Sequence, residues 1–221
     1  MLARLAHVRN WIFDLDNTLY PASANLFARI DERIGAYVGA HFGVGAEEAR
    51  RIQKRYFHDH GTTLAGLMAE HGVDPHDYLA RVHDIELDTL EQNAPLAAAI
   101  ARLPGEKYVF TNADAPYAMR VLDRLGLSES FAGIHDVHAC GYVPKPHPGA
   151  YAAMCDAFGI DPAESLFADD MARNLKPARA IGMTTVWVDN GSEQGPETDR
   201  GFIDFTTGDI TRWLHDIQET S

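Results

Sequence analysis

The chain has 221 residues, of which 46% are hydrophobic and 23% are charged, a balance that is typical of globular proteins and excludes disorder as the main state. Its 19 basic residues against 32 acidic ones leave a formal net charge of −13, which argues against polymeric nucleic acid as a partner, because such binding depends on Lys and Arg neutralising phosphates. No apolar stretch approaches the ~20 residues that span a bilayer, and Cys140 and Cys155 lack CxxC or zinc-ligand spacing, so we expect a cytoplasmic protein without a membrane segment.

The first predicted element is a buried strand, Trp11-Ile12-Phe13, which runs directly into Asp14. Residues 22–92 then show no convincing strand pattern. The start of that segment repeats apolar residues at spacings of four, as an amphipathic helix does. We predict four helices in this segment, at residues 24–41, 46–58, 62–71 and 75–82.

From about Ala94 onward the pattern changes, because helices now alternate with strands. After a helix that runs through Leu103, we predict strands at residues 107–110, 165–168 and 184–188, a weak strand at 202–205, helices at 116–125, 148–158 and 172–181, and a last helix near the C-terminus. The stretch at residues 135–140 is interpreted as a loop, and residues 190–200 as a polar loop rich in Gly and Pro.

Strands and helices that alternate at this spacing predict a parallel sheet with right-handed crossovers. We therefore predict an α/β fold, a Rossmann-like parallel sheet with helices on both faces, formed by residues 1–20 and 94–221. A small all-helical domain, residues 21–93, is inserted after the first strand.

Polar side chains follow three of the predicted strands where each strand ends. The first strand leads into Asp14-Leu15-Asp16-Asn17-Thr18, the second into Thr111-Asn112 and the third into Asp169-Asp170. Ligands of open α/β sheets bind at the carboxyl ends of the strands. Lys145 lies between two prolines in the segment that connects the second and third of these strands. We therefore expect all four segments to meet at one edge of the sheet.

The four carboxylates of this set are expected to need a cation. Asp14, Asp16, Asp169 and Asp170 repel one another at close range unless a positive ion lies between them. Oxygen ligands without His or Cys favour Mg2+, and an ion with open positions favours an anionic substrate such as a phosphate. Any one of these Asp residues could instead cap the helix that follows its strand, but four such segments in this order make that interpretation weak.

These residues carry a family resemblance. Asp14 to Thr18, DLDNT, resembles the DxDx[TV] signature of the haloacid dehalogenase (HAD) superfamily. Thr111-Asn112 resembles its second motif, Lys145 its third and Asp169-Asp170 its fourth, in the right order along the whole core. The family often has an Asp late in the fourth motif, where this chain has Asn174, which would orient Lys145 or a water.

The resemblance implies a role for each residue of the first motif. Asp14 would be the nucleophile that attacks phosphorus and forms an aspartyl-phosphate. Asp16 would protonate the leaving oxygen and later activate water, while its backbone carbonyl binds the metal. Thr18 would belong to the phosphate-binding set.

The other motifs would bind the metal and the phosphoryl group. Asp169 would be a metal ligand, and Asp170 would bind the metal or orient a water on it, so that the metal set comprises Asp14, Asp16, Asp169 and Asp170. Thr111 and the backbone amide of Asn112 would hold phosphoryl oxygens, and Lys145 would stabilise both the nucleophile and the transferring group.

The helical insertion resembles the C1 cap of subfamily I of this superfamily, the part that closes over the site and selects the substrate. Within it, the segment from Tyr56 to Leu67 resembles a YxxYGTTLxGL-like stretch of the pyrimidine 5'-nucleotidase-like subgroup. The resemblance implies that Phe57 and Thr62 contact the sugar or base of a nucleotide.

Three functions are therefore weighed. The leading one is a Mg2+-dependent phosphomonoesterase for a small phosphorylated metabolite, most of all a pyrimidine nucleoside 5'-monophosphate. The second is a sugar-phosphate or phosphoglycolate phosphatase, or a phosphosugar mutase, on the same core. The third is a non-catalytic nucleotide-binding protein, which the presence of Asp14, Asp16 and Lys145 disfavours. We expect a monomer or a homodimer.

Overall fold

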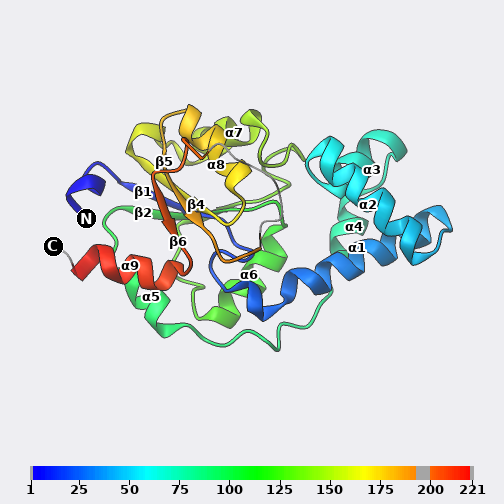
Figure 1. Ribbon diagram of the computed structural model, residues 1–221, viewed down its shortest axis with the longest axis horizontal. Coiled ribbons are helices and arrows are strands. Elements are labelled where there is room, and N and C mark those ends of the chain that lie inside the picture. The colour runs from blue at the N-terminus through cyan, green and yellow to red at the C-terminus, as the bar shows by residue number, and fades with distance from the viewer. Residues whose placement is uncertain (1, 193–199, 220–221) are drawn as a thin grey trace.

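The computed structural model describes residues 2–192 and 200–219 and contains one parallel sheet (Figure 1). The six strands of this sheet follow the order β3-β2-β1-β4-β5-β6, and every neighbouring pair is parallel. The strands are β1 (Asn10–Phe13), β2 (Glu106–Phe110), β3 (Gly133–His135), β4 (Ser165–Asp169), β5 (Thr184–Val188) and β6 (Phe205–Thr207). The predicted α/β fold with a parallel sheet is confirmed.

Side-chain caps and prolines define several helix starts. Asp74, Asn93 and Asp114 each accept a backbone N–H of the helix that they precede, and a proline occupies its first turn. The helices are α1 (Leu26–Phe42), α2 (Ala46–His60), α3 (Thr63–His71), α4 (Pro75–Val82), α5 (Ala94–Ala101), α6 (Ala115–Leu125), α7 (Pro148–Phe158), α8 (Ala172–Ala180) and α9 (Ile210–Glu219), with short 3-10 turns at Leu2–Leu5, Ala22–Ala24 and Pro162–Glu164.

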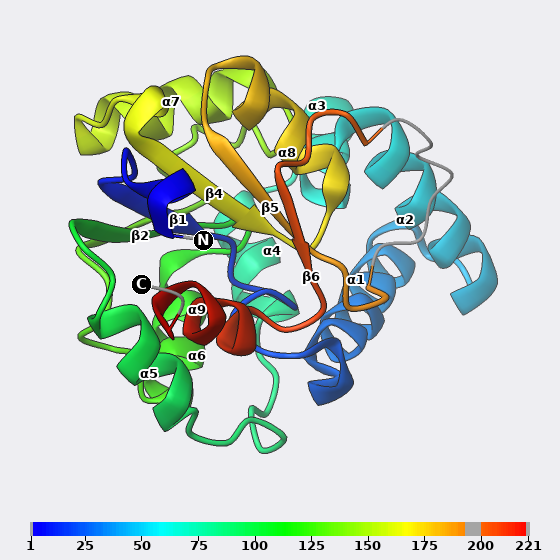
Figure 2. The same ribbon diagram turned by 60° about the vertical axis from the view of Figure 1, so that its left-hand side comes forward.

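Helices cover both faces of the sheet. Successive strand residues point to opposite faces, so each buried strand packs against both helical layers. Phe13 packs into an apolar cluster that includes residues of α5, α6 and α9, whereas its neighbour Ile12 packs with residues of α7 and α8. Figure 2 shows these two layers on either side of the strands. The sheet is thus buried on both faces, as parallel sheets are.

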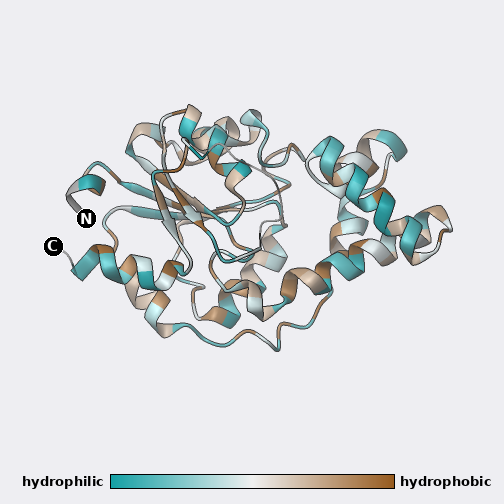
Figure 3. Cartoon of the chain, in the orientation of Figure 1, coloured by the Kyte–Doolittle hydropathy of each residue, from teal (hydrophilic) through white to brown (hydrophobic). Residues whose placement is uncertain are grey.

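Helices α1 to α4 lie at one end of the molecule and have an apolar cluster of their own (Figure 1). No strand interrupts the chain between β1 and β2. Figure 3 shows α2 as mostly hydrophilic, which fits its position on the outside. Leu26 and Leu90, near the two ends of the predicted insertion, pack into the larger core cluster instead. The domain boundaries near residues 20 and 94 stay a prediction. No helix in the described ranges is both long and apolar enough to cross a bilayer.

Two predictions along the chain are wrong. Residues 133–135 form the edge strand β3, which is too short to show an alternating pattern, so that His135, the first residue of the loop predicted at 135–140, belongs to a strand. The strand predicted at 202–205 begins only at Phe205, because Asp204 uses its carboxylate to accept the backbone N–H of Thr185. Of the loop predicted at 190–200, residues 193–199 lie outside the described residues.

Candidate active site

The site lies at the carboxyl ends of β1, β2 and β4. Strand β1 runs between β2 and β4, so that Phe13 is level with Val109 on one side and Ala168 on the other. The backbone N–H of Asp14 extends this ladder by donating to Ala168 O at 2.9 Å. The central position of β1 therefore places Asp14 between the second and fourth motifs, at the switch point of the sheet.

Lys145 links three of the predicted segments. Its Nζ donates to Asp14 Oδ1 at 2.7 Å, to Asp169 Oδ2 at 2.8 Å and to Phe110 O at 2.8 Å, and only 1% of the residue is exposed. Burial lowers the pKa of Lys145, but the two carboxylates outweigh it and raise the pKa above its usual value. The ammonium group therefore stays charged beside the predicted nucleophile.

Asn112 holds the backbone of Lys145 with its side chain. Its Oδ1 accepts the Lys145 N–H at 2.9 Å, and its Nδ2 donates to Lys145 O at 3.2 Å. Thr111 is 1% exposed, and its hydroxyl accepts the Ala113 N–H at 3.0 Å. The two residues of the second motif thus order the loops around the site; their predicted contacts with phosphoryl oxygens stay a prediction.

Three carboxylates form a cluster that can hold a metal ion. One oxygen each from Asp14, Asp169 and Asp170 lies within 4.8 Å of the others, and all three residues are buried. Burial raises the pKa of Asp14 despite the opposing charge of Lys145, and burial together with Asp169 raises the pKa of Asp170 to about 7. Once all three carboxylates are ionised, Lys145 neutralises only one of the three charges. Two negative charges on hard oxygen donors therefore fit a divalent cation such as Mg2+.

Asn174 orients Asp169. Its Nδ2 lies 3.0 Å from each Asp169 oxygen, and the Met171 N–H donates to Asp169 Oδ1 at 2.8 Å. Lys145 Nζ donates to the same carboxylate. Asn174 is therefore expected to orient Lys145 indirectly, through Asp169.

Thr18 bridges the first and fourth motifs. Its hydroxyl lies 3.4 Å from Asp14 Oδ2 and accepts the Asp170 N–H at 3.0 Å. Two residues that the motifs did not reveal also hold Asp170: Ser192 donates its hydroxyl to the carboxylate, and Trp187 Nε1 donates to the backbone oxygen at 2.9 Å. Trp187 lies near the end of β5 and Ser192 follows that strand. This position is the one feature of the sequence that predicts the two residues at the same edge of the sheet as the motifs.

Asp16 has different neighbours from the other carboxylates. The hydroxyls of Tyr117, at 2.9 Å, and Tyr20 both donate to Asp16 Oδ1, so its side chain lies outside the three-carboxylate cluster. Burial and the neighbouring Asp16 charge raise the pKa of both phenols, which keeps them as neutral donors. Neither tyrosine could be predicted from the sequence, because no motif spacing links them to Asp16.

The turn between α2 and α3 touches the core. A Cβ on Gly61 would lie 3.3 Å from Pro144 Cγ, next to Lys145. The Phe57 ring is 39% exposed and packs under the Arg173 guanidinium, whose Cζ lies 4.2 Å from the ring centroid. Thr62 caps α3 by accepting the Ala65 N–H at 3.1 Å. The structure thus places Phe57 at the edge of the site, whereas the Thr62 hydroxyl oxygen caps the start of α3.

A family model described as a haloacid dehalogenase-like hydrolase matches residues 8–182. That range contains all four motifs of the site. The match therefore covers the sheet from before β1 to just before β5, together with the helical segment.

The chain is similar to relatives of known name and to solved structures. It is 25% identical over 189 residues to Phosphate metabolism protein 8 of Saccharomyces cerevisiae, covering 78% of this chain but only 59% of that protein. It is 26% identical over 223 residues to the Glyceraldehyde 3-phosphate phosphatase of Methanopyrus kandleri, covering 93% and 95% of the two chains. A HAD phosphatase from Thermococcus onnurineus superposes with a TM-score of 0.61 over 96% of this chain and 97% of that chain at 16% identity, which shows the shared fold.

Proposed function

Because the chain belongs to the haloacid dehalogenase-like hydrolase family, we propose that it is a Mg2+-dependent phosphomonoesterase that works through an aspartyl-phosphate. The observation that carries the proposal is the contact of the buried Asp14 carboxylate with Lys145, combined with a second carboxyl group, Asp16, two residues further along. Phosphoryl transfer needs a nucleophile, positive charge and a proton donor at one place. The archaeal relative with a phosphatase name supports the same reaction class.

The proposed reaction has two steps. An Asp14 oxygen attacks phosphorus, the bond to the leaving oxygen breaks, and Asp16 gives that oxygen a proton. Asp16 then takes a proton from water, whose oxygen attacks phosphorus and releases Asp14 with inorganic phosphate. Lys145 supplies positive charge beside Asp14 throughout. Mg2+, held by Asp14, Asp169 and Asp170, would neutralise phosphoryl charge.

Asp16 favours phosphoryl chemistry over dehalogenation. A halide leaves without being protonated, whereas an alkoxide leaving group needs a proton. A dehalogenase therefore does not need a general acid at this position. Both tyrosine hydrogen bonds to Asp16 support a role that depends on its exact orientation.

We propose a nucleoside 5'-monophosphate, most of all a pyrimidine nucleotide, as the substrate, with the helical insertion acting as a C1 cap. Phe57 supports this choice, because an exposed aromatic ring next to Arg173, three residues after Asp170, offers a base a surface for stacking. A sugar-phosphate or phosphoglycolate phosphatase, or a phosphosugar mutase, is the second candidate, favoured by the name of the archaeal relative.

Phosphate release from nucleoside monophosphates, sugar phosphates and phosphoglycolate, measured with Mg2+, tests the proposal. Asp14→Asn should lower the rate on every substrate at least ~10³-fold, because a nucleophile cannot be replaced by an amide. Asp136→Asn, which alters another buried carboxylate near the same sheet edge, is the matched control and should remain active. An active Asp14→Asn protein would refute the mechanism.

The same panel separates the substrate classes. If a pyrimidine nucleotide is the substrate, Phe57→Ala should reduce nucleotide turnover about tenfold more than sugar-phosphate turnover, since base stacking is worth ~1–3 kcal/mol. Phe27→Ala, on α1, removes an exposed ring of similar size as the control. Sugar phosphates turned over faster than all nucleotides would instead support the second candidate.

A further inference from the structure

The Asp16 carboxyl group is held by two buried tyrosines that come from distant parts of the chain. Tyr20 lies four residues after Asp16, whereas Tyr117 belongs to α6. The tyrosines are 2% and 1% exposed, and both hydroxyls donate to the same oxygen, Oδ1. Within residues 2–192 and 200–219, no hydrogen bond to the other oxygen, Oδ2, is found.

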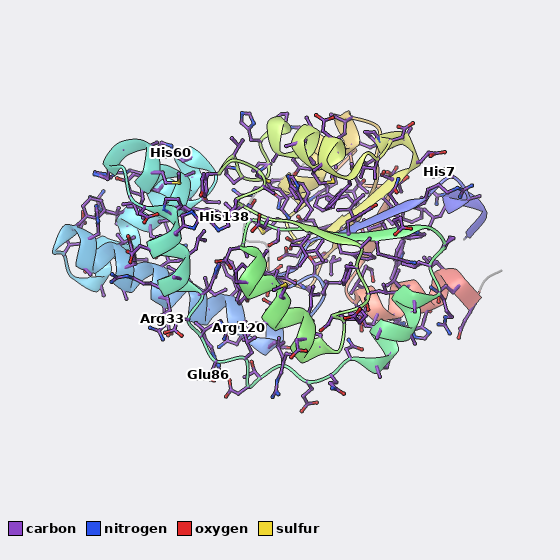
Figure 4. All side chains as sticks on the ribbon, turned by 180° about the vertical axis from the view of Figure 1, so that it is seen from behind. His7, Arg33, His60, Glu86, Arg120 and His138 are labelled. Atoms are coloured by element: carbon purple, nitrogen blue, oxygen red, sulfur yellow. The ribbon has the colours of Figure 1, made fainter. Side chains whose placement is uncertain are left out.

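Several contacts fix the Tyr117 ring in turn. It stacks on the His83 imidazole with a centroid distance of 4.5 Å and an interplanar angle of 16°. Asp114 accepts the Tyr117 N–H at 3.0 Å and lies 3.1 Å from His83 Nδ1. Arg120, labelled in Figure 4, donates from the next turn of α6 to the backbone oxygens of His83 at 3.0 Å and Ile85 at 2.7 Å. Tyr117 is therefore tied to the segment that leads back from the helical insertion.

We propose that Tyr20 and Tyr117 are positioning residues that present Asp16 Oδ2 to the leaving oxygen of the substrate. A carboxyl oxygen that already accepts two hydrogen bonds has no lone pair left for a proton, so the proton that is transferred resides on the other oxygen. Two donors on Oδ1 also stop rotation of the carboxyl group. This inference rests on the proposed phosphatase function.

Two aryl phosphates of nearly equal shape test the inference. Phenyl phosphate needs its leaving oxygen protonated, whereas the nitro group of p-nitrophenyl phosphate stabilises the departing phenolate without help. Tyr117→Phe and Tyr20→Phe should each lower kcat/KM for phenyl phosphate about 10-fold to 100-fold, and kcat/KM for p-nitrophenyl phosphate less than about threefold. Tyr108→Phe is the matched control, because it removes another buried phenol, one stacked on Phe158, and should change neither value.

An Asp16→Asn background shows whether the tyrosines act through Asp16. Adding Tyr117→Phe to Asp16→Asn should cause no further loss, since the group that it positions is already absent. Thermal unfolding checks that each variant is folded. If Tyr117→Phe does not fold, Tyr20→Phe tests the inference independently. Equal losses on the two substrates, or no loss on phenyl phosphate, would overturn the inference.

The outcome also distinguishes this inference from the proposed function. If the wild type hydrolyses both esters and Asp14→Asn hydrolyses neither, the proposed function stands, and the tyrosine variants then decide the inference alone. If the wild type with Mg2+ hydrolyses neither ester nor any substrate of the panel, both proposals fall together.

Discussion

The Asn112 side chain has no charge, yet it satisfies both backbone groups of Lys145. The Lys145 ammonium group contacts two carboxylates and a backbone oxygen, so a shift of its backbone would disturb all three contacts at once. Groups that orient a catalytic side chain in this way commonly affect rate more than affinity. Asn112 is therefore a residue whose loss should separate catalysis from stability.

We predict that Asn112→Ala lowers kcat about 10-fold to 100-fold, because the loop that carries Lys145 loses both side-chain hydrogen bonds. The free energy of unfolding should fall by only ~1–3 kcal/mol, the typical cost of two such bonds. Asn10→Ala is the control: Asn10 donates its side-chain amide to Ser165 at the opposite end of the strands, and its loss should leave kcat unchanged. Equal kcat values for the two variants would contradict the positioning role.

At the scale of elements, the packing of α2 against α3 depends on a glycine. Gly66 lies in the middle of α3, and a Cβ added there would come within 2.6 Å of the Tyr56 ring. Tyr56 is 1% exposed, and its hydroxyl lies 2.7 Å from His71 Nε2, so the ring has little room to move. The close contact of the two helices therefore excludes any larger residue.

Gly66→Ala should lower the free energy of unfolding by ~1–3 kcal/mol through overpacking, although alanine is the better helix former. Gly35→Ala, in the middle of α1, is the matched control. Its Cβ would meet the nearest atom, Gln53 Oε1, at an ordinary 3.5 Å, and the variant should gain up to ~1 kcal/mol. Denaturant unfolding of both variants measures the difference, and a stabilised Gly66→Ala protein would show that α2 and α3 do not pack so closely.

At the scale of the whole molecule, the buried carboxylates couple stability to pH and to metal. In the absence of metal, the folded protein keeps the Asp170 proton up to about pH 7, whereas the unfolded chain releases it near the ordinary pKa of 3.8. Between these pH values the folded state therefore binds more protons than the unfolded state. The pKa of Asp14 is raised in the same direction. Stability should then decrease as pH rises through this window, and level off above it.

Without Mg2+, we predict that the contribution of Asp170 lowers the free energy of unfolding by up to about 1.4 kcal/mol per pH unit from about pH 4 to pH 7. Mg2+ competes with the proton for the carboxylates, so it should raise Tm more at pH 8 than at pH 5. Asp170→Asn should reduce both effects, and NaCl at equal ionic strength controls for screening. An equal Mg2+ effect on Tm at both pH values would argue against a carboxylate site.

Most of the helices and strands, the parallel sheet and the four motif segments were predictable from the sequence. These features depend on local signals: apolar periodicity, caps such as Asp114, and polar residues directly after buried strands. Because parallel strands end at one edge, Asp14 and Asp169 could be predicted to meet without coordinates, whereas Lys145 does not directly follow a strand and is not placed by this rule. The edge strand β3 was not predicted and β6 was predicted three residues too early, since three residues are too few to show a period.

The side chains that support those motifs are set by tertiary packing and could not be predicted from the sequence. Tyr117 lies 101 residues from Asp16, and Asn112 lies 33 residues from the backbone that it holds. Hydrogen bonds of this kind need donor and acceptor atoms that lie about 3 Å apart. That distance is set by how helices and loops pack on the sheet, and it leaves no spacing pattern in the sequence. The stacking of Phe57 under Arg173 has the same origin, because it joins two separately predicted helices. Local pattern determines the elements, whereas contacts between them complete the site.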